Sequence, residues 1–460
     1  MHGMATPPRK ISLLVLLLSV IAQTCDGQQP ETCTSPIVKS GLEPGNFNSG
    51  IVFDTPNTAI SVALSGNGTV ALVGNRNVLG ASGVVRAFRW NASTLVWDRM
   101  GQRTSDMQGL TNGNAQGHAV AISADGTIAL AGAPNFGVTP NFNRGTARAY
   151  RWNPSTSRWI RMAAFDEEMA GVANDFAGTS VALSADGTTA LIGAIGQSTN
   201  PGRARAYRWN STSWVRMGND TQMEGFANNG RAGAAVALSA DGNIALVTIP
   251  AWTSNRGMAR AYTWNAGTST WDRLGNVDAD MSALSLTPQL GFSASLSADG
   301  TIALLGLRTY ANGAFTNAGT AWAYKYNSGT ARWARMGNTD NDMAASATQR
   351  FSGTSVSLSA DGTKALVGTP GENPFVGMTR LFAWNAGTSR WLVVAGSADT
   401  DMQGPGGGSF SGNAVALSTN GAVALVGGSG TSVHARAFSC IYTCPVIDSG
   451  SRLLICFTLD

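Results

Sequence analysis

One short pattern, an Asp-Gly or Asn-Gly turn between two alternating apolar runs, occurs seven times along this chain of 460 residues. Two of the copies read "SADGTTALIG" and "SADGTIALLG". Such a turn between alternating runs predicts a β-hairpin. The copies begin at residues 65, 123, 184, 239, 297, 359 and 418, so the unit returns every 55 to 62 residues and predicts a repeat architecture.

A second hairpin follows each of the first six copies, as in "GTARAYRWNPSTSRWIRMA" and "GMARAYTWNAGTSTWDRLG". Four alternating runs joined by turns predict four antiparallel strands per unit, and no helical periodicity interrupts them. The 56 glycines and the charged fraction of 13% suit a turn-rich β protein, while 43% hydrophobic residues suffice for a core. We therefore predict an all-β fold, a seven-bladed β-propeller of four-stranded antiparallel blades over residues 59–440.

The seventh unit has a first hairpin and a third strand at "SVHARAFSC", but no fourth strand with a Trp. That strand must come from the N-terminal segment, residues 28–58, or from "RLLICFTL" in the C-terminal tail, residues 441–460, and the sequence leaves both open. Cysteines lie near both ends, so we expect a disulfide between the N-terminal segment and the tail to clasp the ring. The sequence does not choose among the three pairings of its four cysteines: Cys33, Cys440, Cys444 and Cys456.

Residues 1–27 read as a secretory signal peptide, with Arg9 and Lys10 before the apolar stretch 11–22. That stretch is too short to cross a bilayer, and no later segment is long and apolar enough to do so. Cleavage after Gly27 leaves an even number of cysteines and is favoured over cleavage after Thr24, which leaves Cys25 as well. We therefore expect a secreted, extracellular protein with four N-glycosylation sequons, at Asn67, Asn91, Asn210 and Asn219.

A Phe and a Gly lead into the first strand in "FAGTSVALS" (176), "FSGTSVSLS" (351) and "FSGNAVALS" (410), and "GAP" follows a second strand at 132–134. Over residues 50–440 the units therefore resemble the FG-GAP repeat of the integrin alpha-chain propeller, and the "SADGT" turn is also similar to WD40-like and TolB-like propeller repeats. The FG-GAP resemblance implies calcium sites in the turns between strands one and two. Calcium takes six or more oxygen ligands. Each turn here offers a single Asp or Asn, and the seven residues are Asn67, Asp125, Asp186, Asp241, Asp299, Asp361 and Asn420. One oxygen-bearing side chain is too few for calcium, so we expect no bound metal, and we expect no other cofactor.

Other residues recur at fixed repeat positions, where a structural role explains them best. The turn Asp closes its hairpin, and Trp pairs such as Trp90 with Trp97 are expected to fill the space between blades. The third-strand arginines could bind an anion as a ring, but we expect each to pair within its own blade: Arg86, Arg148, Arg205, Arg260, Arg380 and Arg436. A Met ends an acidic loop after each fourth strand, and three carboxylate pairs there are alternative cation sites: Asp278 with Asp280, Asp340 with Asp342, and Asp399 with Asp401.

Signals for catalysis are weak. Only His118 and His434 remain after removal of the signal peptide, without metal-ligand spacing, and no G-x-S-x-G nucleophile motif is present. A net charge of +4, with most arginines spread over repeat positions, argues against nucleic-acid binding. We leave the question of catalysis open and favour a non-enzymatic protein. The alternatives are a secreted hydrolase or lyase with carboxylates in the central funnel, and a matrix structural protein without a discrete site.

In a four-stranded blade, the turns joining strands one to two and three to four lie on one face of the disc, and the other connections lie on the opposite face. Three of the four sequons fall on the first face. The loops between strands two and three vary most and carry aromatic residues that the repeat does not require: Phe136, Phe142, Trp252, Tyr310, Phe315 and Phe375. Exposed aromatic residues on the loops of a rigid scaffold are typical of recognition surfaces, although some could pack onto neighbouring blades. We expect a binding or adhesion protein that recognises an extracellular protein or glycan through this second face.

Overall fold

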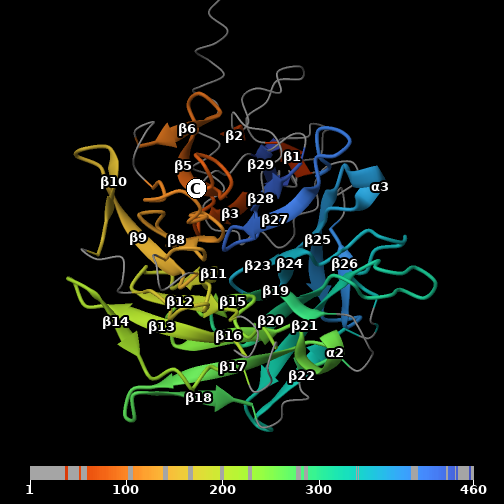
Figure 1. Cartoon of the computed structure of the whole chain (residues 1–460). Helices are drawn as coiled ribbons and strands as arrows, with labels where there is room; N and C mark the ends of the chain where they lie inside the picture. The colour runs from red at the N-terminus through yellow and green to blue at the C-terminus, as the bar shows by residue number, and fades with distance from the viewer. Residues whose placement is uncertain are drawn as a thin grey trace, which may run out of the picture.

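Seven β-sheets form a ring in the computed structural model of the chain (Figure 1). The structure describes residues 37–39, 51–52, 60–101, 107–137, 143–163, 169–196, 201–225, 230–275, 281–283, 289–337, 339, 341–394, 402–430, 434–440, 442–443 and 455–456. Six of the sheets contain four antiparallel strands that follow one another in sequence order. The predicted all-β, seven-bladed propeller is therefore confirmed.

The strands of the first four blades follow the predicted hairpins. Blade one contains β3 (Ile60–Leu64), β4 (Val70–Asn75), β5 (Val84–Asn91) and β6 (Val96–Met100). Blade two contains β7 (Val120–Ile122), β8 (Ile128–Ala133), β9 (Thr146–Asn153) and β10 (Arg158–Arg161). Blade three contains β11 (Ala177–Leu183), β12 (Thr189–Ala194), β13 (Arg203–Trp209) and β14 (Trp214–Met217). Blade four contains β15 (Val236–Leu238), β16 (Ile244–Ile249), β17 (Met258–Asn265) and β18 (Thr270–Leu274).

The remaining blades continue the ring. Blade five contains β19 (Leu290–Leu296), β20 (Ile302–Leu307), β21 (Thr320–Asn327) and β22 (Arg332–Met336). Blade six contains β23 (Ser355–Leu358), β24 (Lys364–Thr369), β25 (Met378–Asn385) and β26 (Arg390–Val393). Blade seven contains β27 (Ser411–Leu417), β28 (Val423–Gly428) and β29 (His434–Cys440). Two short turns of four residues, α2 (Trp252–Asn255) and α3 (Glu372–Phe375), lie in the loops between strands two and three of blades four and six, and Thr253 and Ser254 in the first have positive φ values.

The N-terminal segment supplies the outer strand of blade seven. Both β1 (Ile37–Lys39) and β2 (Ile51–Val52) pair with β29 in antiparallel fashion, and Ile37 lies opposite Cys440 (Figure 1). The tail instead forms a separate two-stranded sheet of β30 (Tyr442–Thr443) and β31 (Ile455–Cys456). Of the two routes that the sequence leaves open, the ring thus uses the N-terminal one. The disulfide clasp stays a prediction, because Cys33 and Cys444 lie outside the described residues.

The first strands of the seven blades are the innermost. Each contacts the first strand of the next blade around the axis, in the order β3, β7, β11, β15, β19, β23, β27 and back to β3. Beside these strands lie the Ser-x-Asp/Asn-Gly turns. The backbone N–H of the residue after the Ser donates to the backbone carbonyl oxygen of the corresponding residue in the next blade. The seven bonds run Gly66 to Ala124, Ala185, Ala240, Ala298, Ala360 and Thr419, and back to Gly66, at 2.7 to 2.9 Å. We call this closed circle the hydrogen-bond ring.

Each turn in the hydrogen-bond ring is held by its own Asp or Asn. In blade three, Ser184 Oγ and the backbone N–H of Thr188 donate to Asp186 Oδ1 at 2.6 and 2.9 Å, and Thr188 Oγ1 donates to Oδ2 at 2.8 Å. Gly187 follows with a φ of +73°. Burial by itself raises the pKa of Asp186, but these hydrogen bonds outweigh it and the pKa is lowered. The structural interpretation of the turn Asp is therefore correct in this blade, and its oxygens already have protein donors.

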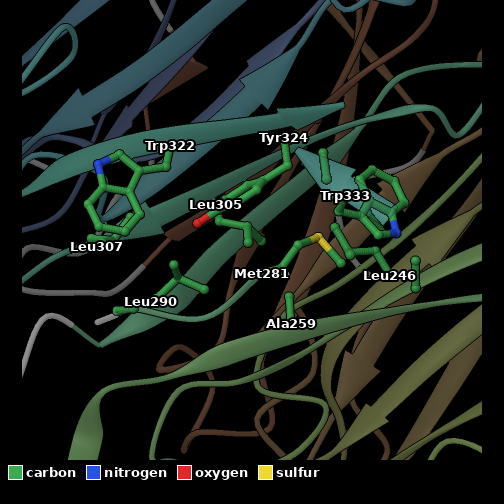
Figure 2. Packing of buried hydrophobic residues seen from close by; sticks show 13 residues of the cluster. Leu246, Ala259, Met281, Leu290, Leu305, Leu307, Trp322, Tyr324 and Trp333 are labelled. Carbon is green, nitrogen blue, oxygen red and sulfur yellow. The ribbon is translucent and has the colours of Figure 1, made fainter. Parts of the chain in front are cut away.

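The repeated tryptophans fill the spaces between blades, as predicted, and the methionines of the loops pack into the same spaces. In blade five, Trp333 is buried and its ring centroid lies 5.4 Å from that of Tyr326. Met281, from the loop that joins blade four to blade five, is 2% exposed. Figure 2 shows its side chain among Leu246 and Ala259 of blade four and Leu305 of blade five. The corresponding methionines of the other loops are equally buried: Met107, Met169, Met223, Met343 and Met402.

Candidate ligand-binding face

We call the side of the disc that carries the loops between strands two and three, together with the connections from strand four to the next blade, the loop face. The two kinds of loop meet at the blade boundaries, where Gly145 forms a bridge with Ala177, and Gly319 forms one with Ser352. Gly319 has a φ of +77°, and a Cβ on it would lie 2.2 Å from the carbonyl oxygen of Ser352. This close approach explains the Gly before the third strand in blades one to six, and it fixes the ends of the variable loops on a rigid frame.

Phe351 and its counterparts in the FG pairs belong to the same frame. Phe176, Phe351 and Phe410 have φ values of 55°, 58° and 46°. The backbone N–H of Phe351 donates to the carbonyl of Asn317 in the preceding blade at 3.1 Å, and that of Phe410 donates to Phe375 at 3.0 Å. The motif that carries the FG-GAP resemblance therefore joins neighbouring blades.

Three of the six aromatic residues predicted to bind ligand pack against the scaffold. The ring of Phe136 lies under Arg148, 5.1 Å from the guanidinium carbon to the ring centroid. Trp252 packs on the cluster formed by Ala232, Ile249 and Met258. Tyr310 meets Trp322 edge to face, with centroids 5.8 Å apart, and its hydroxyl donates to Asn341 at 3.2 Å. Each of these three is half-buried, which leaves only part of its ring for a ligand.

Two of the predicted aromatic residues stand out from the surface. Phe315 is 41% exposed in the loop of blade five, and Phe375 is 44% exposed at the end of α3 in blade six. Phe375 has a φ of 63°, and its ring lies 5.3 Å from that of Phe410. The two exposed rings thus belong to neighbouring blades. The sixth predicted residue, Phe142, lies outside the described residues.

Arg308 stands at the start of the loop that carries Phe315, and the prediction missed it. Its guanidinium carbon lies 5.0 Å from the ring centroid of Phe292 and 4.9 Å from that of Phe351. Its Nε atom is buried and has no hydrogen-bond partner, and burial lowers the pKa of this arginine. A signal was present in the sequence, because the same position after strand two holds Pro134, Ile195, Pro250 and Pro370 in other blades.

Arg76 occupies that position in blade one and has a partner. Its Nη1 atom lies 2.8 Å from Nδ1 of His118, a residue of the next blade. Burial and then the positive charge of Arg76 lower the pKa of His118 to about 4. The imidazole is therefore neutral near pH 7, and His118 serves a contact between blades one and two.

Two of the third-strand arginines, Arg148 and Arg205, bind residues of the loops that enter or leave their own blade. Arg205 forms ion pairs with Asp175 at 2.7 Å and with Asp220 at 2.6 Å. Burial alone would raise the pKa of Asp220, but hydrogen bonds from Arg216 and Arg205 lower it to about 2. Arg148 donates instead to the side-chain oxygen of Gln116. These contacts give Arg148 and Arg205 structural roles and leave them little capacity for an anion.

Asp342, the one member of the predicted carboxylate pairs that the structure describes, joins two blades. Asp342 accepts hydrogen bonds from Thr339 at 2.6 Å, from Arg390 at 3.0 Å and from the backbone N–H of Trp391 at 3.1 Å. Arg390 and Trp391 belong to β26 of the next blade, so Asp342 links blades five and six. The other members of the three predicted carboxylate pairs lie outside the described residues: Asp278, Asp280, Asp340, Asp399 and Asp401.

The four sequon asparagines differ in their surroundings. Asn67, Asn210 and Asn219 are exposed, and each accepts a hydrogen bond on Oδ1 from the hydroxyl of its own sequon Thr, at 2.8, 2.9 and 2.9 Å. The half-buried Asn91 donates from Nδ2 to Asp98 at 2.8 Å. Since a glycan would be attached to Nδ2, the first three are the more accessible acceptors.

A cavity of about 470 Å³ opens on the outer rim of the ring, away from the loop face. Its lining comes from β9 and β10 of blade two and from Trp209 of blade three, and it includes Trp152, Ile160 and Arg161. The repeated Trp pairs place partly exposed indoles at this rim. Among the residues that the structure describes, no group of three or more His, Cys, Asp or Glu side chains could hold a metal ion.

Within the described part of the chain, no helix is long and apolar enough to cross a membrane. No known protein-family profile matches the sequence, and no curated protein is significantly similar to it.

Proposed function

We propose that this chain is a secreted, glycosylated propeller of the FG-GAP, integrin alpha-chain type that binds an extracellular protein or glycan through its loop face. The observation that carries the proposal is the pair of exposed rings, Phe315 at 41% and Phe375 at 44%, on neighbouring blades of a rigid ring. Aromatic side chains contribute strongly to recognition because they offer a large contact area with little conformational freedom to lose.

The surrounding framework supports a preformed surface. Asn312 and Phe315 exchange backbone hydrogen bonds at 3.0 and 3.1 Å, which holds the tip of the blade-five loop. The Phe375 carbonyl accepts from Phe410, which holds the blade-six loop against blade seven. A surface fixed in this way loses little entropy when it binds.

The experiment is binding of residues 28–460 to immobilised glycans and extracellular-matrix proteins, compared with a double variant, Phe315→Ala with Phe375→Ala. We expect saturable binding by the unaltered chain and a loss of at least about tenfold in the double variant, since each ring is worth roughly 1 kcal/mol or more. Leu95 is 55% exposed in a turn on the opposite face, and Leu95→Ala is the matched control. Saturable binding with equal affinity for all three chains would contradict the proposed face. If none of the three chains binds any glycan or matrix protein, the proposed binding function is wrong. Hydrolase substrates should then be tested.

A further inference from the structure

We infer that the ligand of the loop face is an acidic polysaccharide, and that Arg308 binds one of its carboxylate or sulfate groups. This inference rests on the proposed function and assigns a chemical class to its ligand. It starts from the position of Arg308, which opens the same loop that carries Phe315 and borders the blade of Phe375.

Arg308 differs from the other half-buried arginines of the loop face. Arg144 Nε donates to the carbonyl of Gly171 at 3.1 Å, and Arg256 Nε donates to that of Ala283 at 3.0 Å. Arg350 donates to the carbonyl of Gly371 at 3.1 Å and lies 3.6 Å from Glu372. Within the described residues we find neither a hydrogen bond nor an ion pair for the Arg308 guanidinium, whose contacts are the two phenyl rings.

The two phenyl rings hold the positive charge of Arg308 without using its N–H donors. Phe292 comes from the first strand of blade five, and Phe351 comes from the FG pair of blade six, so both belong to the rigid frame. A cation–π contact engages the charge, whereas carboxylates and sulfates bind through the planar N–H fork. An arginine held in one place, whose Nη donors have no protein partner among the described residues, is suited to bind an oxyanion, because little side-chain freedom remains to be lost.

The exposed rings suit a polysaccharide. Phe315 and Phe375 are 41% and 44% exposed, so each presents part of its ring at the surface. Exposed rings on the loops of two adjacent blades can stack against the apolar faces of sugar rings, while Arg308 binds a charged substituent of the same chain. Neutral polysaccharides would lack the group that Arg308 binds.

The test compares four polymers at fixed ionic strength by calorimetry: polygalacturonate, heparin, dextran and polyglutamate. Polygalacturonate and heparin distinguish a carboxylate from a sulfate ester, dextran is neutral, and polyglutamate is an acidic peptide. We expect binding of polygalacturonate or heparin, weaker at higher salt, and a loss of about tenfold or more in Arg308→Gln. Arg308→Lys retains the charge without the fork and should bind with intermediate affinity. Arg151→Gln, at the exposed outer rim, is the matched control and should bind like the unaltered chain.

Several outcomes would overturn the inference. If Arg308→Gln and Arg151→Gln bind the acidic polymer with equal affinity, Arg308 does not contact the ligand. If dextran binds as tightly as the acidic polymers, the ligand does not need an acidic group. If polyglutamate alone binds, the ligand is an acidic peptide and not a polysaccharide. If none of the four polymers binds but a matrix protein does, and that binding requires Phe315 and Phe375, the inference fails while the proposed function stands. Thermal unfolding of every variant checks that the fold is intact.

Discussion

The backbone N–H of Thr419 donates to the carbonyl oxygen of Gly66 at 2.8 Å, and the Thr419 hydroxyl donates to the same oxygen at 2.8 Å. The two residues are 353 positions apart in the chain. They complete the hydrogen-bond ring between blade seven and blade one, with the same backbone bond that joins every other pair of neighbouring blades. Ring closure therefore uses both this bond near the axis and the pairing of β1 and β2 with β29 at the outside.

Deleting residues 28–52 should destabilise the protein much more than deleting residues 445–460. The first change removes β1 and β2 and leaves one edge of β29 unpaired, at a cost of roughly 1 kcal/mol per lost backbone hydrogen bond. Guanidinium unfolding followed by Trp fluorescence measures the difference. The full-length reference and both deletions should be compared with all their remaining cysteines replaced by Ser, so that a lost disulfide does not contribute. A larger effect of the C-terminal deletion would contradict this assignment of the closing strand.

Gly319→Ala and Gly313→Ala, in the same loop, form a matched pair. Both glycines have positive φ values, +77° and +60°, but a Cβ at Gly313 meets nothing within 4 Å, whereas one at Gly319 would lie 2.2 Å from the Ser352 carbonyl. We expect Gly313→Ala to cost about 1 kcal/mol from backbone strain alone. Gly319→Ala should cost about 3 kcal/mol or more because two blades must separate. Similar unfolding midpoints for the two variants would show that the boundary between blades five and six accommodates a Cβ at position 319 without a large loss of stability.

Asp186→Ala should lower the free energy of unfolding by about 1 to 3 kcal/mol, since it leaves Ser184 and Thr188 without their acceptor. Asp186→Asn should cost less, because Asn67 and Asn420 accept from Ser65 and Ser418 at the same positions in blades one and seven. The folded pKa of Asp186 is lowered, so its contribution is complete above the unfolded pKa and is lost as the pH falls through the folded value. Urea unfolding at pH 7 and pH 3 should show a smaller difference between the unaltered chain and Asp186→Asn at pH 3. A difference that does not change with pH would mean that the carboxylate charge adds nothing to the turn.

His118 should make the stability depend on pH between about 6.5 and 4. Its folded pKa of about 4 lies below the unfolded value of about 6.5, so the unfolded chain takes up the proton first. The stability from neutral His118 is therefore complete above pH 6.5, falls as the pH drops towards 4 and then levels off, by an amount of the order of 3 kcal/mol. His118→Gln should remove this part of the slope.

The imidazole titration of His118, followed by NMR, tests the cause of its lowered pKa. Burial is the larger cause and the charge of Arg76 the smaller, so Arg76→Gln should raise the midpoint only part of the way towards 6.5. A midpoint near 6.5 in the unaltered chain would contradict the buried contact between blades one and two.

Local chemistry specified most of the architecture. The Ser-x-Asp-Gly turns encode their own hydrogen bonds within six residues, and strict alternation of apolar residues places one face of each strand in the core, so the number of blades and their strands could be read directly. A structural role for the repeated Met of the loops was predicted for the same reason, because a residue repeated from unit to unit performs a task that the units share.

Features that depend on one particular neighbour could not be read in this way. Both terminal segments contain short apolar runs, and only the spatial path of the chain brings β1 rather than the tail to β29. Tyr310 and Phe315 lie in the same loop, yet Tyr310 packs down because blade five has Trp322 where other blades have Arg, while Phe315 stays exposed. Arg308 is set apart by Phe292 and by Phe351, 43 positions away on the next blade, which hold its charge without using its donors. Repetition encodes the ring because the shared contacts are local in sequence, whereas the binding face arises from unrepeated residues that meet only after the blades have closed.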